Sequence, residues 1–554
     1  MEASNLQIYW HESQPVYSLC FQPTTKTINK DNNDDNVHDI PRELFTAGGD
    51  NRIRMWRLNM TSNGTKVETI DYLSSLQQHE QAVNVVRFNN GPCDNLASAG
   101  DDGVVLLWRR YEKDQVINNS KFREPMGIND NEETSVSWYI WKRLRSNSGS
   151  EIYDLAWSPD NRYIAVACMD NCVRVFDVES GRCIVCESAH SHYVQGIAWD
   201  PLNEYILSQS ADRSVVIYKL SFTTADPVVS GGDETAGAQK LIGLQFFARI
   251  LKGSLPERDE STGQILSYDS SRTSYLFHNE TLTSFFRRLA ISPCGSLFCI
   301  PAGIFRVGDP NAAPINAVYI YTRGTLSQLN QNGGSGGGSG VRPPIVLPFF
   351  KKPAVAIAFN PVFYKLDKPV NEVQQQPFID LPYKLYFAVA TLNEIIIYGT
   401  NHVEPVAIVN NLHYTPLTDL SWSSDGKMLM VSSTDGFCSY VSIDQKLLGE
   451  ALDKETWSKY IGAISTDGVK QDEKNEKEKK VATESSEEKK KFDIVNILPV
   501  KRRFCGNKES VSVTQPSTKG KGEGEAKSET NTSSSSDTST TVKSKRRIQP
   551  VLIE

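Results

Sequence analysis

Two cysteines and three histidines are the side chains whose types and spacing could support metal binding or acid–base chemistry. Cys183 and Cys186, within "CIVC", have the spacing of half a zinc site, but no second pair completes the set. They lie in a segment that reads as a strand, where residues three apart point to opposite faces. His190 and His192, within "HSH", and His79 could act as bases or ligands. No other residues complete a catalytic or metal-binding set around them, so we predict structural roles for all five.

Five aspartates recur at one position of a repeated pattern, in short turns between apolar segments. They are Asp50, Asp102, Asp170, Asp212 and Asp435. Aspartate, asparagine and glycine suit such turns because they tolerate positive φ or bond to the local backbone. We therefore predict turn and hydrogen-bond roles for them. The sequence also lacks a phosphate-binding glycine motif, an H-E-x-x-H motif and a Gly-x-Ser-x-Gly elbow. It predicts a binding protein with no enzymatic activity and no cofactor.

The turns belong to a segment that occurs seven times in the first 450 residues. Each copy begins with a short strand that ends in an aromatic or aliphatic residue, as in "YDLAWSP" and "VQGIAWDP". These seven anchors are Phe21, Phe88, Trp157, Trp199, Ile291, Phe359 and Trp422. The shortest spacing between anchors, 42 residues, matches the length of about 40–45 residues for one four-stranded propeller blade. The sequence thus predicts an all-β fold, a seven-bladed β-propeller over residues 1–450.

The two ends of the repeat region predict how the ring closes. The seventh copy supplies three strands, and an unassigned strand, "LQIYWHE", precedes the first copy. Because an unpaired sheet edge invites aggregation, we expect the N-terminal strand at residues 6–10 to complete the last blade. The long insertions are polar or rich in glycine and serine, and we expect loops there. They cover residues 24–41, 111–149, 222–272, 324–344 and 366–380.

The charge is divided unevenly along the 554 residues. From residue 451 onward, 21 basic and 17 acidic residues give +4, whereas residues 1–450 carry 38 basic and 49 acidic residues, or −11. An acidic body is unlike a general DNA-binding surface, so we expect no direct sequence-specific binding of nucleic acid. No apolar run approaches the roughly 18 residues of a membrane span, and the N-terminus lacks the pattern of a secretory signal. Ten cysteines without framework spacing then predict free thiols in a reducing compartment.

Residues 451–554 form a polar tail that contains two apolar–basic segments. Its mixed-charge and serine-rich stretches cannot bury enough surface to fold, so we expect a mostly disordered chain. The segments 492–504, "FDIVNILPVKRRF", and 543–554, "KSKRRIQPVLIE", interrupt this composition and predict docking sites. In the second, Ile548, Pro550 and Leu552 share one face of an extended strand that could add to a sheet edge. Nuclear-import signals are expected in the basic clusters, which contain Lys501, Arg502 and Arg503, and Lys543 and Lys545.

The repeats resemble those of the WD-repeat family. Trp56 and Trp108 stand where the signature tryptophan of that family would be, and other copies have Phe176, Tyr218 or Tyr398 there. WD repeats often carry a buried histidine bonded to the turn aspartate, which is the role implied for His79 and His190.

Longer strings resemble the family of WD-repeat middle subunits of chromatin assembly factor 1. They include "LQIYWHESQPVYSL", "SEIYDLAWSPDN", "HYVQGIAWDPLNEYILSQSADRS", "YLFHNETLTSFFRRLAISPCG" and "NILPVKRR", with "KRRIQPVLIE" at the end. The resemblance implies a non-enzymatic subunit of a nuclear histone chaperone complex that deposits histones H3–H4 during replication and repair. The implied partners are the large and small subunits of that complex, H3–H4, and the anti-silencing-function H3–H4 chaperone. The implied binding motif for this last partner is Arg546, Arg547, Ile548 and Pro550, with Leu552 as a weaker member.

Three alternatives belong to other functional classes. A replication-independent histone regulator of the WD type would normally carry a long folded C-terminal region. A ubiquitin-ligase substrate receptor would often show "WDxR" after the second strand of a blade, where this chain has "WRLN", "WRRY" and "FDVE". A propeller enzyme acting on sugars or with a metal would need paired carboxylates or a set of histidines. None of these signals is found in the sequence.

Overall fold

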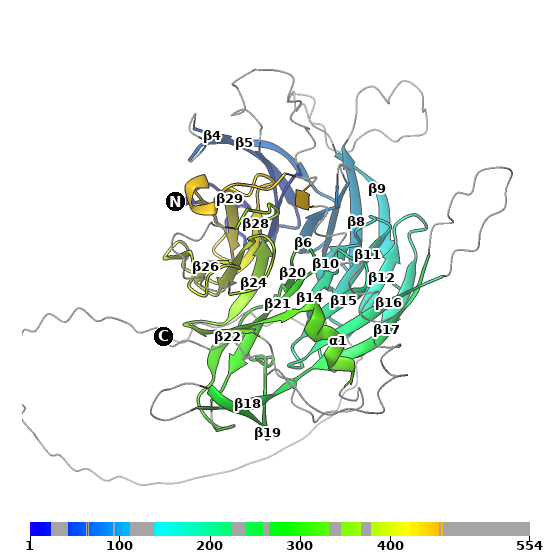
Figure 1. Ribbon diagram of the computed structural model, residues 1–554. Helices are drawn as coiled ribbons and strands as arrows, with labels where there is room; N and C mark the ends of the chain where they lie inside the picture. Colours follow the sequence, from blue (N-terminus) through cyan, green and yellow to red (C-terminus); the bar gives the residue numbers. More distant parts are fainter. Residues whose placement is uncertain are drawn as a thin grey trace, which may run out of the picture. The chain divides into compact units, whose positions relative to one another are not determined.

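The repeats form seven four-stranded antiparallel sheets (Figure 1). The computed structural model describes residues 1–23, 42–61, 64, 66–91, 95–110, 138–223, 240–258, 265–307, 309–331, 345–366, 378–453 and 456–457. The chain divides into two units, Met1–Ile497 and Leu498–Glu554, and every described residue lies in the first. The predicted all-β, seven-bladed propeller is confirmed.

Blades 1 to 4 follow the chain in order. Blade 1 contains β2 (Val16–Phe21), β3 (Arg42–Gly48), β4 (Ile53–Met60) and β5 (Val67–Leu76). Blade 2 contains β6 (Val83–Phe88), β7 (Asn95–Gly100), β8 (Val104–Arg110) and β9 (Trp138–Arg145). Blade 3 contains β10 (Ile152–Trp157), β11 (Tyr163–Cys168), β12 (Val173–Asp177) and β13 (Cys183–Glu187). Blade 4 contains β14 (Val194–Trp199), β15 (Tyr205–Ser210), β16 (Val215–Phe222) and β17 (Leu241–Ile250).

Blades 5 to 7 complete the ring and carry the additional elements. Blade 5 contains β20 (Ala290–Ile291), β21 (Leu297–Phe305), β22 (Ile315–Thr322) and β23 (Ile345–Phe350). Blade 6 contains β24 (Ala354–Phe359), β25 (Tyr386–Thr391), β26 (Glu394–Gly399) and β27 (Ala407–Asn410). Blade 7 contains β28 (Leu417–Trp422), β29 (Met428–Ser433), β30 (Cys438–Ser442) and β1 (Glu2–Leu6). A separate hairpin pairs β18 (Lys252–Arg258) with β19 (Ile265–Tyr275), and the helices are α1 (Arg323–Gln331) and α2 (Gln445–Leu448).

The first strand of each blade lies at the centre of the ring. Each of these inner strands contacts the inner strand of the next blade, and β28 contacts β2 to close the circle. Both faces of a blade pack against neighbours, so its inner and middle strands read as continuous apolar runs rather than alternating ones. All six residues of β11, for example, are buried.

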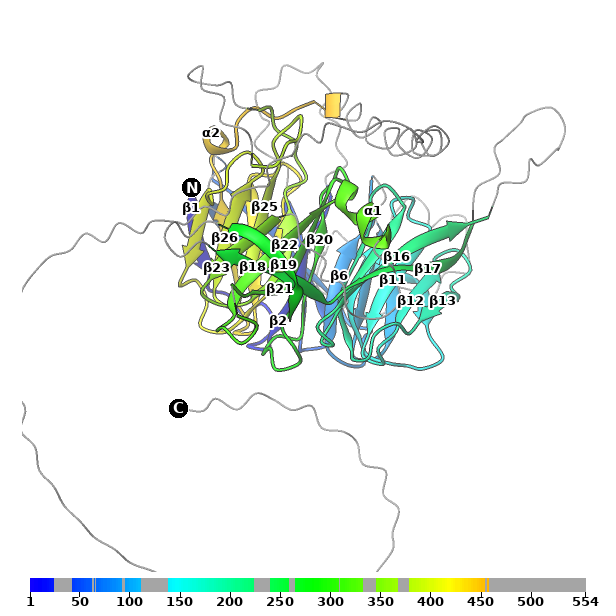
Figure 2. The ribbon, with the colours of Figure 1, turned by 60° about the horizontal axis from the view of Figure 1, so that its bottom comes forward.

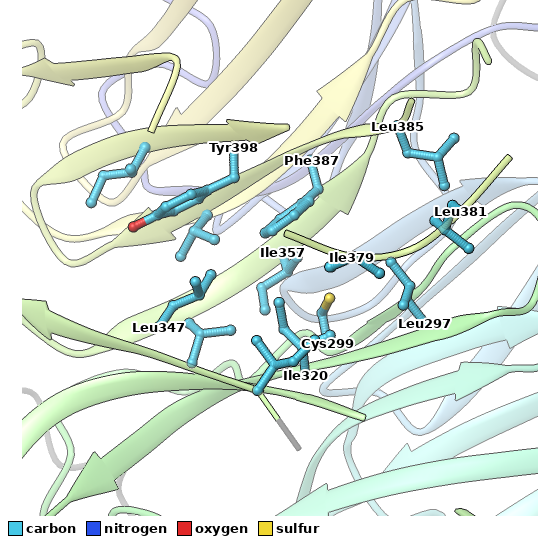
Figure 3. Close-up of a cluster of buried hydrophobic side chains, with 14 of the residues drawn as sticks. Leu297, Cys299, Ile320, Leu347, Ile357, Ile379, Leu381, Leu385, Phe387 and Tyr398 are labelled. Carbon is cyan, nitrogen blue, oxygen red and sulfur yellow. The ribbon is translucent and has the colours of Figure 1, made fainter. Parts of the chain in front are cut away.

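The hydrophobic core is divided among the interfaces between blades. Each pair of neighbouring blades has its own buried cluster among the described residues. Figure 3 shows the cluster between blades 5 and 6, where Cys299 and Ile320 face Ile357 and Phe387. A fully buried aliphatic or aromatic side chain contributes about 1.5–3 kcal/mol, so each interface stabilises the ring substantially.

A β-bulge recurs near the start of six inner strands. The register shifts between Val16 and Ser18 in β2 and at the equivalent position of β6, β10, β14, β24 and β28. A bulge inserts one residue and re-aims the side chains that follow it. In blades 1, 3 and 7 the residues just after the bulge are Ser18, Asp154 and Asp419. These three side chains lie at the centre of the ring.

The strand that closes the ring lies earlier in the sequence than expected. β1 pairs with β30 from Glu2 opposite Ser442 to Leu6 opposite Cys438. The expected strand at residues 6–10 shares only Leu6 with it, because the chain then turns. Trp10 Nε1 donates to the Leu6 carbonyl at 3.1 Å, and the buried Trp10 ring packs 4.8 Å from Trp56. The apolar alternation in "LQIYW" therefore serves a core-filling turn.

Two predicted loops contain regular strands. β9 lies inside the expected loop 111–149, and β17 and most of the β18–β19 hairpin lie inside the expected loop 222–272. β9 and β17 are the outermost strands of their blades, so buried and exposed positions are mixed along them and the continuous buried run of an inner strand is missing. The expected loop at 324–344 likewise begins as α1, which packs against β17 and β22 (Figure 2).

Candidate functional site

The turn aspartates lie at one end of the ring, which we call the upper face; the opposite end is the lower face. Four of the five are bonded to a buried histidine through its Nδ1 atom. The pairs are His11–Asp50 at 2.6 Å, His79–Asp102 at 2.7 Å, His190–Asp212 at 3.0 Å and His413–Asp435 at 3.0 Å. Sequence reasoning singled out His79 and His190 but missed His11 and His413. Both missed residues stand about 20 to 40 positions before their aspartate, as the other two do.

The second ring nitrogen of each histidine is also engaged. Nε2 lies 2.7–2.8 Å from the hydroxyl of Thr46, Ser98, Ser208 or Ser439. In blades 1 and 2 that hydroxyl also accepts from the indole of Trp56 or Trp108 at 2.9 Å. The hydroxyl proton is then directed at Nε2, so Nδ1 carries the proton that goes to the carboxylate. With both nitrogens occupied in a buried site, these histidines hold turns in place.

The electrostatics agree with a structural role. Burial pushes the pKa of the Asp50 carboxyl upward, but its hydrogen bond to His11 and the nearby charges of His11 and Arg54 outweigh this and lower the pKa. Asp102, Asp212 and Asp435 show the same direction of pKa shift for the same reason, each beside its own histidine. These four aspartates therefore stay ionised and serve as hydrogen-bond acceptors.

Blade 3 uses a different partner at this position. Asp170 accepts from Arg174 Nη1 at 2.8 Å and from its Nη2, and the hydrogen bond helps to lower the pKa of Asp170 despite burial. Arg174 lies four residues after Asp170, on the strand that follows the turn. An intrablade ion pair thus takes the place of the histidine.

The remaining candidate ligands do not assemble into a metal site. His192 accepts from the Tyr193 backbone amide at 3.0 Å and packs against the Tyr193 ring. Cys183 and Cys186 are exposed on β13, and the eight described cysteines are all free thiols. Among the described residues, no group of three or more histidine, cysteine, aspartate or glutamate side chains could hold a metal ion.

The centre of the ring contains an ion network that the sequence analysis did not find. Arg288 Nη1 donates to Asp154 at 2.6 Å, and its Nε lies 3.5 Å from Asp419. Arg87 meets both oxygens of Asp419, at 2.7 and 3.0 Å, and Ser18 donates to the same carboxylate at 2.6 Å. The network joins blades 1, 2, 3 and 7 to the segment that enters blade 5.

Arg288 lies at the middle of this network. Its Nη2 donates to the carbonyls of Asn84 at 2.8 Å and Tyr17 at 3.2 Å, and its Nε to that of Thr418 at 3.3 Å. The Phe286 ring covers it, 4.3 Å from the guanidinium carbon. Burial raises the pKa of Asp419, but Arg288 and Arg87 outweigh burial and lower it, so the carboxylate remains charged.

The sequence contained one signal for the charged residues of this network, which is their position within the repeats. Asp154 and Asp419 occupy the same place in "YDLAW" and "TDLSW", and Arg87 stands in "VVRF" where other copies have alanine, serine or cysteine. Beside the network the central channel widens to a cavity of about 180 Å³. Its lining combines aliphatic side chains, among them Leu19, Leu155 and Ile197, with the four charged residues of the network, Arg87, Asp154, Arg288 and Asp419.

On the lower face, the chain beyond β30 packs back onto blade 6. Glu450 accepts from the backbone amide of Lys365 at 2.9 Å, and Ala451 bridges to Tyr364. Leu452 donates to the Phe363 carbonyl at 2.7 Å, and the Trp457 ring stacks 5.0 Å from that of Phe363. We call residues 444–457 the C-terminal strap. These contacts with blade 6 extend beyond residue 450, the predicted end of the propeller.

The tail residues that were predicted to bind partners lie outside the described residues. These are Arg546, Arg547, Ile548, Pro550 and Leu552, and the basic positions Lys501, Arg502, Arg503, Lys543 and Lys545. Within the part of the chain that is described, no helix is long and apolar enough to cross a membrane.

Known proteins resemble this chain along most of its length. A family model described as the CAF1B/HIR1 beta-propeller domain matches residues 1–230 and 229–448. The chromatin assembly factor 1 protein CAF1B of Saccharomyces cerevisiae is 46% identical over 523 residues, which cover 92% of this chain and 97% of that protein. The Schizosaccharomyces pombe protein of the same name is 35% identical over 81% of this chain and 89% of its own length.

A second branch of the family is more distant. Protein HIR1 of Yarrowia lipolytica is 25% identical over 78% of this chain, but the matched part covers only 37% of that protein. The identity to the two CAF1B proteins is higher, and each match covers most of this chain and most of the relative. The chain therefore belongs to the CAF1B family, the β-propeller subunits of chromatin assembly factor 1.

Proposed function

We propose that this chain is the WD-repeat subunit of chromatin assembly factor 1 and acts as a non-enzymatic scaffold in the nucleus. In this role it supports deposition of histones H3–H4 into nucleosomes during replication and repair. The observation that carries the proposal is the 46% identity to the Saccharomyces cerevisiae CAF1B protein over 97% of that protein. The site geometry supports it, because the upper-face histidines and the channel carboxylates are all engaged in structural bonds.

The propeller is proposed to bind the large subunit of the complex and to lie beside the small subunit and H3–H4. A ring with seven apolar interfaces and a cross-linked channel is a rigid support for such contacts. We expect residues 1–457 to co-purify with the large subunit when the two are co-expressed. The piece should end at 457, because a cut at 450 removes the Trp457–Phe363 stacking. If only the full chain co-purifies, the tail carries this interaction and the proposal for the propeller is wrong.

The end of the tail is proposed to bind the anti-silencing H3–H4 chaperone. Arg546 and Arg547 would engage acidic groups, while Ile548, Pro550 and Leu552 fill an apolar site on a sheet edge. We expect Arg546→Ala with Arg547→Ala to abolish pull-down of this chaperone and to leave the large subunit bound. Arg502→Ala with Arg503→Ala removes the same charge from the other basic cluster and should retain the chaperone. Unchanged capture by the Arg546/Arg547 variant would refute this docking site.

Two other functions receive less support. A replication-independent histone regulator would be related to the HIR1 branch, to which the identity is 25%. A ubiquitin-ligase substrate receptor has no supporting feature among the described residues. Co-purification of the full chain with the large subunit of chromatin assembly factor 1 separates the proposed function from both.

A further inference from the structure

The outer strand pair of blade 2 concentrates basic side chains. Arg109 and Arg110 end β8, and Lys142, Arg143 and Arg145 follow on β9, which has no acidic residue. The register places Arg110 opposite Trp138 and Val104 opposite Arg145, so the cations extend along the full length of β9. Four of the five are exposed, and Lys142 is partly exposed. We call these five residues the basic edge.

The basic edge differs from the rest of the propeller in its pairing. Elsewhere, basic side chains commonly meet carboxylates, as Arg42 meets Asp425 at 2.6 Å and Lys351 meets Glu394 at 2.8 Å. None of the five cations of the basic edge forms an ion pair with a carboxylate of the described residues. Arg109 donates to the Asn95 side chain at 2.7 Å and Arg143 to that of Gln78 at 3.0 Å. Cations without carboxylate partners on a body with a charge of −11 leave a local positive surface.

A groove adjoins the basic edge on the side of blade 3. It has a volume of about 290 Å³ and is lined by Arg109, Trp141 and Lys142 of blade 2 and by Asn161, Arg162 and residues 177–179 of blade 3. The Trp141 ring lies 4.1 Å from the Arg109 guanidinium carbon and 5.3 Å from Lys142 Nζ. An aromatic wall framed by cations suits an apolar side chain flanked by acidic residues.

β9 is the outermost strand of its sheet, so none of the other described strands pairs with its second edge. Eight residues of strand extend over about 25 Å and offer backbone donors and acceptors along that edge. We propose that the outer edge of blade 2 binds an extended acidic segment of a partner protein. The segment pairs with the β9 backbone, its carboxylates meet Arg110, Arg143 and Arg145, and one apolar side chain enters the groove beside Trp141.

A peptide fits this surface better than a nucleic acid does. A free strand edge supplies hydrogen bonds that a peptide backbone can complete and a phosphodiester chain cannot. Asp177 and Glu179 also line the groove and disfavour any anion inside it, which fits the entry of an apolar side chain there while the acidic residues stay on the arginine side of β9. The negative charge of residues 1–450 opposes the close approach of a duplex on either side of the narrow basic edge.

Peptide binding to the full chain tests the proposal directly. The probe is a fluorescein-labelled ten-residue peptide in which glutamate alternates with valine, with one tryptophan at its centre, measured by fluorescence anisotropy. We expect Arg143→Glu with Arg145→Glu to weaken binding at least tenfold. The matched control is Lys219→Glu with Arg249→Glu, an equal charge change on the outer strand pair of blade 4, where both side chains are exposed. The control should change binding less than twofold, and thermal unfolding verifies that both variants fold.

Three further measurements separate the proposed mode from its rivals. The same peptide with alternate backbone amides methylated cannot pair with β9, and equal binding of this peptide would refute strand addition. A 20-base-pair DNA duplex that binds more tightly than the peptide through the same arginines would refute an acidic peptide as the ligand. Residues 111–137 contain six acidic and three basic residues. If the peptide binds only after residues 112–136 are replaced by a short glycine–serine linker, this loop is the occupant and the proposal fails.

Discussion

Arg288 and Arg87 in the central channel and Arg143 and Arg145 on the outer edge of blade 2 are the same side chain in opposite surroundings. Arg288 is buried, and its guanidinium reaches two carboxylates and three backbone carbonyls contributed by blades 1, 2, 3 and 7. Arg143 and Arg145 are exposed, and neither meets a described carboxylate. A buried cation must be fully bonded to be tolerated, whereas an exposed one keeps its charge free for a partner. The channel arginines thus connect the blades, and the edge arginines give the surface of blade 2 a positive charge.

Removing the central cation should have the largest effect. Arg288→Ala removes the cation that is bonded to the buried Asp154 and one of the two cations that face Asp419, so Arg87 alone must balance two buried carboxylates. We expect a loss of about 3–5 kcal/mol in the free energy of unfolding, because a buried charge without its partner is strongly destabilising. Urea denaturation of residues 1–457 measures the loss.

A surface ion pair gives the matched control. Arg42→Ala breaks the pair with Asp425, in which the aspartate side chain is 40% exposed, and should cost less than about 1 kcal/mol. Equal losses for Arg288→Ala and Arg42→Ala would contradict the structural role of the channel network.

The upper-face histidines should produce an intermediate, pH-dependent effect. Burial lowers the pKa of His11 below its ordinary value of 6.5, although Asp50 acts in the opposite direction. As the pH falls below 6.5, the unfolded chain therefore takes up the proton first, and stability decreases until the folded pKa is reached. The lowered pKa of Asp50 causes a second loss once the pH falls below the ordinary value of 3.8.

We expect His11→Gln to flatten the dependence of thermal stability on pH just below 6.5. The variant should also be less stable at neutral pH, because the bonds to Asp50 and Thr46 are weakened or lost. His192→Gln serves as the control, since His192 bonds to the Tyr193 amide and to none of the described turn aspartates. Identical slopes for wild type and His11→Gln would exclude His11 as the titrating group.

The smallest effect on stability is expected at the basic edge. Arg143→Ala with Arg145→Ala removes two exposed side chains that have no described carboxylate partner, so the free energy of unfolding should change by no more than about 0.5 kcal/mol. The same urea experiment checks this value. A loss comparable to that of Arg288→Ala would mean that these arginines stabilise the blade, and the contrast between centre and rim would disappear.

The repeat pattern predicted most of the fold because propeller blades are local units. An apolar strand that ends in an anchor residue is visible in every repeat, and five of the repeats also have a turn aspartate, so seven copies could be counted and the anchors placed. Outer strands were harder to recognise: β9 and β17 are partly exposed, and they lie next to long polar insertions rather than beside a turn aspartate. The closing strand was predicted at residues 6–10 but lies at Glu2–Leu6. Trp10 fills the core from a turn, and the alternation of apolar and polar residues looks the same in such a turn as in a strand.

The sequence by itself determined the blades and their turns, and the resemblance to WD repeats added the His79 and His190 pairings, because all of these depend on residues within one repeat or at its boundary. The ion network depends on the closed ring. Asp154, Arg288 and Asp419 come from positions up to 265 residues apart and meet only when all inner strands face one axis. The same holds for the C-terminal strap, where Trp457 finds Phe363 across 94 residues. Contacts of this range are set by how the blades pack around the channel, and only the tertiary structure could decide them.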